Sequence, residues 1–600
     1  MVAGPGTRGP FDPSQVGLAS SAMGHRRQRS VRRRVALFVA SCLALAGCTH
    51  TFACTHGRQT NGKHGFVSGA LAQPPRWQMK SPHGSRTGLT APSATAEAAG
   101  AAEEEPQGFW PTPTERKKLV PLALMFFCIL FNYTILRDTK DVLVVTAPKS
   151  GAEIIPFLKT YVQLPGSIVF TILYSKMSNS MSQEKIFRIV VITFLAFFAA
   201  FGFFIYPNVG WLHPHALADK LALMVPSRFA AAIAIFRNWS YALFYMMAEL
   251  WGSITISVLF WGLANRIMTV PEAKRYYSLF GLGANVSLIL SGQYVRFVSR
   301  LRANLPPGVD AWGFSLRLLT GAVLVAGGTI LLAHRRVVNK ILNDPTCIDE
   351  SALKKAKTKT KMGLAESAKY LASSSYIRNL AMMVIGYGMS INIVEVTWKS
   401  RLKAQYADPN SYSMFMGMFS SVTGTITLFS MLASRFIFQK FGWGFAAKIT
   451  PLMILSTGSI FFSQVLFPGL WSPVAIALGT TPLMLSVLVG AAQNILSKSS
   501  KYALFDPCKE MAYIPLDAEQ KSKGKAAIDV IGNPLGKSGG SFIQQVCIFG
   551  FGSLAASAPC LGGVLIVVVT AWLAAARSLD KEMMAKEKEA AAEAAAASAD

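Results

Sequence analysis

Charged and polar side chains recur inside a long apolar run between residues 228 and 264. The set is Arg237, Tyr241, Tyr245, Glu249, Ser253 and Ser257, spaced in steps of four. This spacing places them on one slowly winding helix face. A charge at the centre of a bilayer costs roughly 2.5–3.5 kcal/mol, so such a face must turn toward other helices or toward water. The pattern is typical of a path for a polar solute rather than of a membrane anchor.

Two further charged faces lie in the second half of the chain. One carries Asn392, Glu395 and Lys399 at positions i, i+3 and i+7, and the other carries Asp529, Asn533, Lys537, Ser541 and Gln545 at steps of four. Glu395 and Lys399 are spaced to form an ion pair with each other. Asp529 and Lys537 are too far apart for that, so we expect their partners elsewhere. Each charge alone also fits a structural tie between helices, but several of both signs favour a solute path.

Motifs of enzymes and metalloproteins are missing from the sequence. Gly532–Ser538 resembles a phosphate-binding loop, but its first glycine is one residue too close to the second, and Pro534 removes an amide N–H. Gly281 and Gly283 lack the third glycine of a dinucleotide-binding turn. There is no HExxH motif or Ser/His/Asp set, and the eight cysteines show no metal-binding spacing. We therefore expect no enzymatic activity, no cofactor and no metal.

The composition is that of a polytopic membrane protein. Of 600 residues, 52% are hydrophobic and only 15% are charged, and the mean hydropathy is +0.36. A span needs roughly 20 residues. About twelve apolar segments satisfy this length, beginning near Leu119, Ile154, Ile186, Arg228, Tyr276, Phe314, Tyr376, Ser413, Ala446, Ser472, Ala526 and Leu561. The fourth is long enough to be tilted or broken. The expected fold class is an all-α protein with about twelve transmembrane helices.

The net charge of +28 is distributed over an N-terminal leader and the loops between apolar segments. Lys and Arg in such loops set the topology and meet anionic lipid headgroups. They could also draw an anionic solute toward a pore mouth. No compact soluble domain remains to carry a nucleic-acid fold, so we expect the lipid bilayer, and no nucleic acid, as the partner of these charges.

The chain divides into five parts. Residues 1–110 form a cleaved targeting leader, in which a basic stretch precedes the apolar run Val35–Ala46 as in a secretory signal. The acid-poor, hydroxyl-rich stretch Thr49–Thr95 that follows is typical of a transit peptide. Such a tandem is found on proteins of plastids with several bounding membranes; one long transit peptide is the alternative. Six apolar segments lie in 111–340 and six in 376–579, around a basic central loop at 341–375, and 580–600 form an Ala/Glu-rich tail.

Two halves of this kind are common in secondary transporters, where the solute binds near the midplane between them. Long motifs in both halves also resemble one known family. They are FNYTILRDTKDVLVVTAPKSGAEIIPFLKTYVQLP (Phe131–Pro165), MAELWGS (Met247–Ser253), FGLGAN (Phe280–Asn285), INIVEVTWKSRLKAQ (Ile391–Gln405), SKYALFDPCKEMAYIPLD (Ser500–Asp517) and GKAAIDVIGNPLGKSGG (Gly524–Gly540). Over residues Thr114–Leu579 the chain closely resembles the plastidic ATP/ADP translocases, nucleotide transporters shared by plastids and obligate intracellular bacteria such as chlamydiae and rickettsiae. The resemblance implies a fold like that of the major facilitator superfamily, with two six-helix bundles rocking around a central cavity.

The resemblance also implies an activity and a set of site residues. Plastidic members import cytosolic ATP in exchange for stromal ADP, with phosphate accompanying ADP, across the inner envelope membrane of the chloroplast. The four charged positions important for transport in the family are matched here by Lys159, Glu249, Glu395 and Lys537. We add as further candidates Asn285, Arg137, Lys140, Asn392 and Asn533. The transport unit is expected to be a monomer.

These charges suggest a mechanism. ATP carries about four negative charges and ADP about three, so a site of low dielectric constant needs cations to hold them. Lys159 and Lys537 would hold the phosphates from the two halves, and in the empty carrier they would pair with Glu249 and Glu395. The adenine would stack on an aromatic ring such as Tyr241, Tyr245 or Phe280.

Two alternatives stay open at the level of sequence. A proton-coupled importer of nucleoside triphosphates would use Glu249 and Glu395 as protonation sites in the membrane. A channel or a structural membrane protein would use the polar faces only to join helices. A channel would conduct without a countersubstrate.

Overall fold

The computed structural model describes residues 111–301, 305–306, 308–342, 344 and 364–597. The predicted leader, most of the predicted central loop and the end of the tail lie outside these residues. The described residues from Thr112 onward belong to one compact unit. All the regular secondary structure described in this unit is helical, which confirms the all-α polytopic fold.

The first half of the chain runs from α2 to η7. Its helices are α2 (Pro113–Thr146), α3 (Ile154–Phe157), η1 (Leu158–Gln163), α4 (Leu164–Ser180), α5 (Gln183–Ala200), η2 (Phe201–Ile205), η3 (Tyr206–Asn208), α6 (Val209–Leu212), α7 (His215–Met224), η4 (Ser227–Phe229), α8 (Ala230–Arg237), α9 (Trp239–Leu250), η5 (Trp251–Phe260), α10 (Trp261–Ile267), α11 (Val270–Leu301), α12 (Ala311–Val337) and η7 (Val338–Leu342). The sequence encodes the start of α2 locally, since Thr112 and Glu115 form a capping box and Pro113 occupies the first turn.

The second half follows the central loop. Its helices are α14 (Leu364–Ser373), α15 (Ser375–Gln405), α16 (Pro409–Leu466), α17 (Pro468–Ala477), α18 (Pro482–Ser500), η8 (Lys501–Phe505), α19 (Asp506–Met511), α20 (Ala518–Ala527), η9 (Ile528–Gly532), α21 (Asn533–Phe551) and α22 (Ala558–Ala597). Helix α14 falls inside the predicted basic loop, so part of that loop is helical. Gly442 has a φ of 74°, a left-handed conformation that glycine adopts without strain, and it divides α16 into two helices.

All twelve apolar segments predicted from the sequence are helical. By length and hydropathy, seven helices among the described residues are suited to span a membrane, and α17 together with α18–α19, bent by 90°, would make an eighth. This number is lower than twelve because α16 is one 58-residue stretch, α4 has only 17 residues, and α11 and α20–α21 carry several charges. The fourth segment is broken, as its length suggested: Asn238 leaves the helical conformation between α8 and α9.

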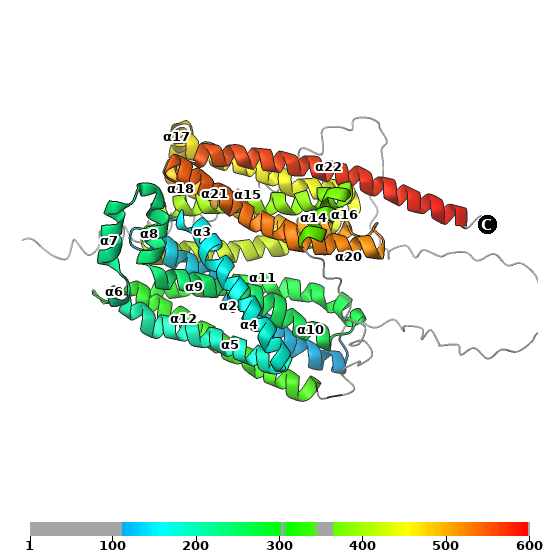
Figure 1. Ribbon diagram of the computed structural model, residues 1–600, viewed down its shortest axis with the longest axis horizontal. Coiled ribbons are helices and arrows are strands. Elements are labelled where there is room, and N and C mark those ends of the chain that lie inside the picture. Colours follow the sequence, from blue (N-terminus) through cyan, green and yellow to red (C-terminus); the bar gives the residue numbers. More distant parts are fainter. Residues whose placement is uncertain (1–110, 302–304, 307, 343, 345–363, 598–600) are drawn as a thin grey trace, which may run out of the picture. The chain divides into compact units, whose positions relative to one another are not determined.

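Within the described unit, the helices of the first half (blue to green) lie beside those of the second (light green to red) (Figure 1). Helix α11 packs along α16, where it joins the two halves. At one end, which we call the closed end (residues 147–157, 403–410 and 545–549), further contacts join the halves. The ring of Phe549 packs against Phe157 and Phe229, and the amino group of Lys403 donates to the carbonyl of Ser150.

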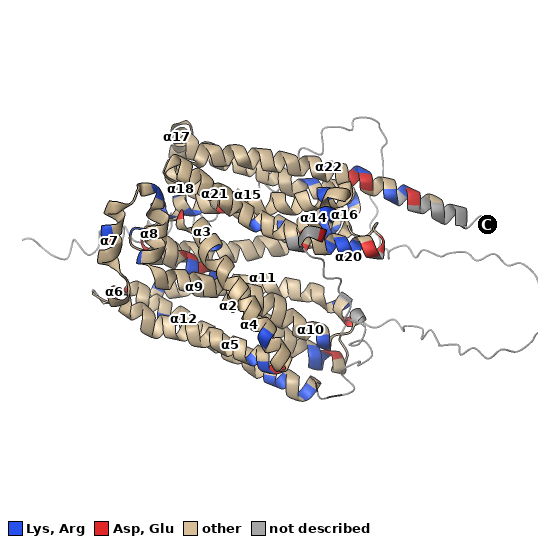
Figure 2. Cartoon of the chain, viewed as in Figure 1, with Lys and Arg blue, Asp and Glu red and all other residues tan. Residues whose placement is uncertain are grey.

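The opposite end, where α2 begins and α4 and α10 terminate, we call the terminal end. Helix α4 runs toward it from the level of Lys159 and buries none of its side chains. Charge is sparse along the helices and gathers at this end (Figure 2). An excess of Lys and Arg at one end of a helical bundle is the charge asymmetry that sets membrane topology.

Candidate functional site

A chain of alternating acids and lysines crosses from the first half to the second. In order, its members are Glu249, Lys140, Asp141, Lys399, Glu395 and Lys498, and successive N···O distances are 3.0, 2.9, 2.8, 3.1 and 3.4 Å. The link between Asp141 on α2 and Lys399 on α15 is the one that joins the halves. Lys140, Asp141 and Lys399 are almost completely buried, whereas the side chains of Glu249 and Glu395 are 26% and 24% exposed. We call this set the charge chain.

The charge chain has equal numbers of acids and bases, which explains why it tolerates burial. Moving a single ion from water into the protein interior costs several kcal/mol of free energy, and removing one partner of a buried ion pair leaves the other charge uncompensated. In this arrangement each inner member contacts opposite charges on both sides. The chain is therefore stable as a whole and sensitive to any ligand that offers its members new partners.

Lys159, Asn392 and Lys537 meet beside this chain. The amino group of Lys159, on η1, donates to Oδ1 of Asn392 on α15. The amide Nδ2 of Asn392 donates to the backbone carbonyl of Lys537 on α21 at 3.0 Å. Asn392 thus connects the two lysines that the sequence assigned to different halves. Among the described residues, no carboxylate forms an ion pair with Lys159.

Close packing of α15 on α21 positions Asn392 against Lys537. A Cβ on Gly388 would come within 2.7–2.9 Å of backbone atoms of Gly536, which cannot move aside as a flexible side chain could. The side chain of Lys537 is exposed. It stands one turn before Ser541 and two before Gln545, whose amide donates to Thr160 Oγ1 at 2.7 Å. Lys537 therefore lies on the face of α21 that meets the first half, further toward the terminal end.

Arg137 lies one turn before Lys140 on α2 and contacts the second half separately. Its guanidinium contacts Asp138 at 3.1 Å and donates to the hydroxyl of Ser420 at 3.0 Å. That hydroxyl in turn donates to Asp138 at 2.7 Å. This triad is a second polar tie between α2 and α16, and its arginine is 22% exposed.

Several predicted site residues lie elsewhere. Asn285 donates to the carbonyl of Gly281 and to the sulfur of Met431, at the contact between α11 and α16. Asn533 donates to Asp529 at 3.0 Å, one turn from Lys537 toward the terminal end. Neither side chain contacts the charge chain among the described residues, and both stay predictions as substrate contacts.

The polar face predicted from Arg237 to Ser257 is not continuous. The break at Asn238 separates Arg237 from the helix that carries Glu249. Arg237 instead pairs with Asp219 of α7, outside the membrane-spanning segments. Hydrogen bonds from Arg237 and Lys149 lower the pKa of the Asp219 carboxyl to about 2. This part of the prediction was wrong because one non-helical residue redirects every side chain that precedes it.

The predicted pairing in the empty carrier also differs from the structure. Lys140, rather than Lys159 or Lys537, pairs with Glu249, and Glu395 pairs with Lys399 and Lys498. The three aromatic rings proposed as adenine platforms are all buried. Tyr245 lies under the amino group of Lys140 at 4.0 Å, Tyr241 packs against His213, and Phe280 packs against Phe126.

Sequence reasoning missed Asp141 and Lys498 and treated Lys399 only as a partner of Glu395. A signal for Asp141 was present. Four charged residues lie within five positions of an otherwise apolar stretch of this helix: Arg137, Asp138, Lys140 and Asp141. They point to different sides of the helix, so whichever side faced lipid would carry a costly charge. Lys498 gave no comparable signal, because it stands near the end of a segment among serines.

Comparison with known proteins identifies the family. The family model described as TLC ATP/ADP transporter matches residues 98–583. The chain belongs to this family. The predicted resemblance to plastidic ATP/ADP translocases is thereby confirmed, and the chain is a transporter rather than an enzyme.

Similar curated proteins come from plants and from bacteria. The chain is 60% identical to the chloroplastic ADP,ATP carrier protein 1 of Arabidopsis thaliana, over 77% of this chain and 73% of that protein. It is 57% identical to the plastidic ATP/ADP-transporter of Solanum tuberosum, over 81% and 77%. Identity to ADP,ATP carrier protein 1 of Chlamydia trachomatis is 50%, over 79% and 90%.

Solved structures show only distant similarity. A bacterial homologue of the iron transporter ferroportin in an inward-facing state gives a TM-score of 0.46 at 14% identity, over 77% of this chain and all of that chain. The nucleoside transporter NupG gives 0.45 at 12% identity, over 76% and 99%.

Proposed function

We propose that this protein exchanges ATP for ADP across a plastid envelope membrane, importing cytosolic ATP against stromal ADP accompanied by phosphate. The observation that carries the proposal is the match of the whole membrane part to a family of ATP/ADP transporters, with 57–60% identity to plastid proteins. We place it in the inner envelope membrane, as the resemblance to the plastidic ATP/ADP translocases implies. The basic leader, with its signal-like and transit-like parts, supports import into a plastid.

The phosphate site of this proposal is built on Lys159, Asn392 and Lys537. Among the residues that the structure describes, Lys159 has an amide and not a carboxylate as its partner, so a phosphate oxygen can replace that contact without first separating an ion pair. Lys537 offers an exposed ammonium from the other half. Lysine is a compact charge on a flexible stem, which suits phosphates that move between ATP and ADP positions. A polyphosphate bound to both lysines would draw the halves together at this level.

The charge chain then acts as a latch at the closed end. The contact between Asp141 and Lys399 stabilises the conformation in which the halves touch near Ser150 and Phe549. Phosphates that recruit Lys399 or Lys140 would compete with Asp141 and Glu249 for these lysines. Bound nucleotide would thus release the latch, while the empty carrier would remain locked. Alternating access with obligate exchange follows when only the loaded carrier changes its opening.

A ligand need not supply a large energy for this switch. About 5.5 kcal/mol of differential binding moves a two-state equilibrium from 99:1 to 1:99. Hydrogen bonds to charged groups contribute about 1.5–3 kcal/mol each. About two new contacts between phosphate oxygens and lysines at the upper value, or about four at the lower value, would supply this difference.

The test measures ATP uptake into ADP-loaded proteoliposomes by variants of the two lysines. We expect Lys159→Ala and Lys537→Ala to raise the KM for ATP about tenfold or more, the factor that corresponds to roughly 1.4 kcal/mol. Lys523→Ala is the matched control, because Lys523 is a lysine at the terminal end that pairs with Glu519 on the surface of α20. Unchanged KM and exchange rate in both test variants would contradict the phosphate site.

A further inference from the structure

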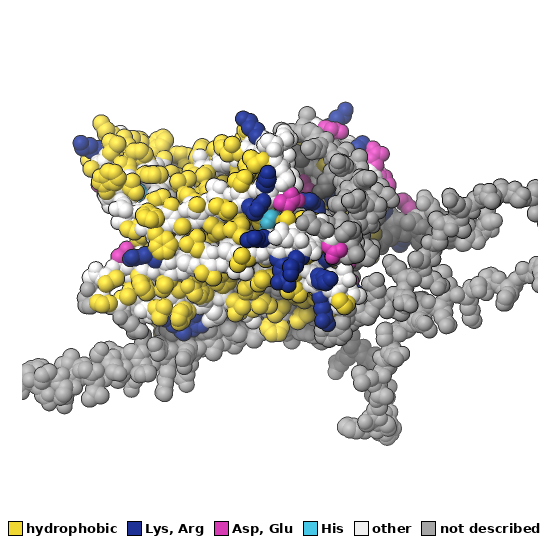
Figure 3. Space-filling view, turned by 90° about the horizontal axis from the view of Figure 1, so that it is seen from below, with side chains coloured by type: hydrophobic (Ala, Val, Ile, Leu, Met, Phe, Trp, Pro, Cys, Tyr) yellow, Lys and Arg dark blue, Asp and Glu magenta, His cyan; other side chains and the backbone are white. Residues whose placement is uncertain are grey.

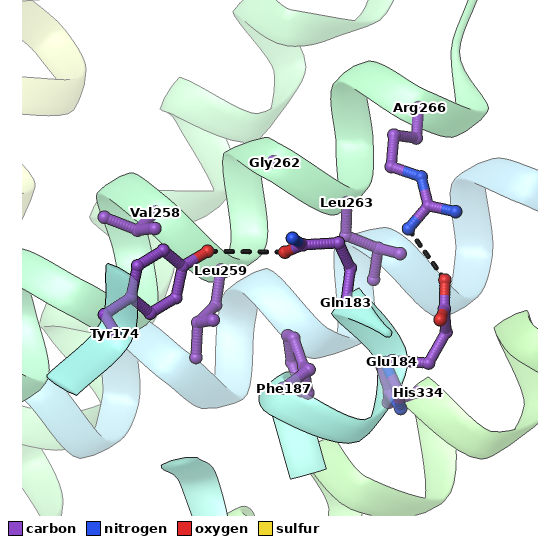
Figure 4. A pocket seen from close by; sticks show the side chains of 10 residues that line it. All are labelled: Tyr174, Gln183, Glu184, Phe187, Val258, Leu259, Gly262, Leu263, Arg266 and His334. Carbon is purple, nitrogen blue, oxygen red and sulfur yellow. Dashed lines mark hydrogen bonds and ion pairs between the residues drawn. The ribbon is translucent and has the colours of Figure 1, made fainter. Parts of the chain in front are cut away.

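A cavity of about 260 Å³ lies at the terminal end of the first half, apart from the charge chain (Figure 4). Its walls come from α4, α5, η5, α10 and α12. Helix α4 ends at Ser180, α5 begins at Gln183 and α10 ends at Ile267. The cavity therefore lies where membrane-spanning helices end, at the depth of lipid headgroups.

His334 is the unusual residue of this cavity. Its side chain lines the cavity but is 99% buried, with 1% relative exposure. Neither ring nitrogen has a hydrogen-bond partner among the described residues. The ring stacks on Phe187 at a centroid distance of 4.1 Å and an angle of 6°, so its orientation is fixed. Since buried polar groups are nearly always hydrogen-bonded, these nitrogens indicate a missing partner.

The other polar groups of the cavity are an ion pair and a hydrogen-bonded pair, Arg266 with Glu184 and Tyr174 with Gln183. Arg266 contacts Glu184 at 2.7 Å and keeps 39% of its side chain exposed. The hydroxyl of Tyr174 lies 3.3 Å from the amide oxygen of Gln183 (Figure 4). Gln183 is also the first residue of α5, and the N-terminus of a helix carries partial positive charge. The exposed part of the Arg266 side chain and the N-terminus of α5 offer positive charge to an anion beside the unpartnered ring nitrogens of His334.

The surroundings favour an anion that carries an apolar part. Exposed basic residues stand beside the cavity on α5 and α12: they are Lys185, Arg188, Arg335 and Arg336. Figure 3 shows Lys and Arg gathered at one end of a broad hydrophobic face. Val258 in the cavity wall and Leu173 on α4 are 40% and 52% exposed, and they continue the cavity into apolar surface.

We propose that this cavity binds the phosphate headgroup of an anionic membrane lipid, whose acyl chains lie along the exposed apolar surface of α4 and η5. Basic pockets between transmembrane helices are suited to such headgroups. Inorganic phosphate shares the headgroup chemistry, but it would make no use of the adjoining apolar surface. A nucleotide is too large, because sites for drug-sized ligands begin at roughly 300 Å³.

The experiment counts lipids bound to the full chain in detergent by native mass spectrometry. Phosphatidylglycerol is titrated first, and then phosphatidylcholine and inorganic phosphate are each tested as competitors. We expect Arg266→Gln to weaken phosphatidylglycerol binding about tenfold, the effect of losing one charge-assisted hydrogen bond. Glu184→Gln removes the acid that competes with the headgroup for Arg266, so it should tighten binding several-fold. Arg435→Gln, which alters an exposed arginine of α16 close to the bend at Gly442, is the matched control.

Opposite shifts in the two cavity variants, with no change in the control, support a lipid site and cannot arise from simple loss of structure. If Arg266→Gln does not fold, the gain expected for Glu184→Gln still decides the question. Equal retention of phosphatidylcholine and phosphatidylglycerol, or displacement of the lipid by inorganic phosphate alone at millimolar concentration, would overturn the assignment to a lipid. Identical affinities in wild type and both variants would overturn the site itself.

Discussion

The contact between Asp141 and Lys399 is the feature whose removal tests the latch. Lys399→Ala deletes a buried ammonium that lies 2.8 Å from Asp141 and 3.1 Å from Glu395. Both acids keep one lysine, because Asp141 still contacts Lys140 and Glu395 still contacts Lys498. The variant therefore loses this one ion pair between the halves without leaving either carboxylate alone.

The expected magnitude follows from these partners. Removing one member of a buried ion pair costs about 3–5 kcal/mol when the remaining charge is uncompensated. Because each acid here retains a partner, we expect the lower range of about 1.5–3 kcal/mol for hydrogen bonds to charged groups. This energy acts only on the conformation that is closed near Ser150. The equilibrium should thus move toward opening at that end by roughly 10- to 150-fold.

A distance measurement across the closed end reads out this shift. Spin labels at Pro148 and Ala407, which are exposed and belong to different halves, report separation of the halves by pulsed electron paramagnetic resonance. In the absence of nucleotide, wild type should give one short distance, and Lys399→Ala should add a longer one. Transport should become less dependent on countersubstrate, since the empty carrier is no longer locked.

Lys498→Ala is the matched control for this experiment. It also removes a lysine from the charge chain, but Lys498 contacts Glu395 within the second half and leaves the link to Asp141 intact. The control should keep the short distance. A Lys399→Ala protein that melts within a few degrees of wild type and shows the same distance distribution as Lys498→Ala would refute the latch.

Two further predictions concern packing and pH. Gly388→Val should force α15 and α21 apart, because its new side chain would overlap the backbone of Gly536. We expect about 1–3 kcal/mol of destabilisation and slower exchange. In the control Gly283→Ala, the new methyl group would meet no atom within 4 Å, so this variant should keep the stability and the exchange rate of wild type. Burial lowers the pKa of His213, in the loop at the closed end, to about 4, so the unfolded chain binds a proton that the folded chain does not between about pH 6.5 and 4. The free energy of unfolding should therefore fall by up to about 3 kcal/mol as the pH drops through this window, and the melting temperature in detergent should fall with it. His213→Asn should remove this slope; an equal slope in the variant would contradict the assignment.

The sequence predicts the helices well because hydrophobic length is a local property. Each predicted segment coincides with a helix, and starts such as that of α2 are encoded by adjacent residues. The break in the fourth segment illustrates the limit. Asn238 leaves the helix with its amide bonded to the carbonyls of Ala234 and Pro148. Pro148 is 90 residues away, so no local pattern could have placed the break.

The sequence predicts which residues form the candidate site better than it predicts which of them contact each other. Lys159, Asn392 and Lys537 carry polar or charged side chains in spans, where such residues are costly and so mark function. Their convergence on one amide depends on the packing of α15 against α21 and of η1 against both. The partner of Glu249 was not predictable in the same way, because Lys140 and Lys159 are both lysines of the first half and only the fold decides which one reaches it.

The most direct test of the central claim is radiolabelled ATP uptake into proteoliposomes that contain this protein. The vesicles are loaded with ADP, with buffer, or with buffer under an imposed pH gradient. We expect rapid uptake only into ADP-loaded vesicles, which would establish obligate nucleotide exchange. Uptake into ADP-free vesicles that follows the pH gradient would contradict exchange and identify a proton-coupled nucleotide importer instead.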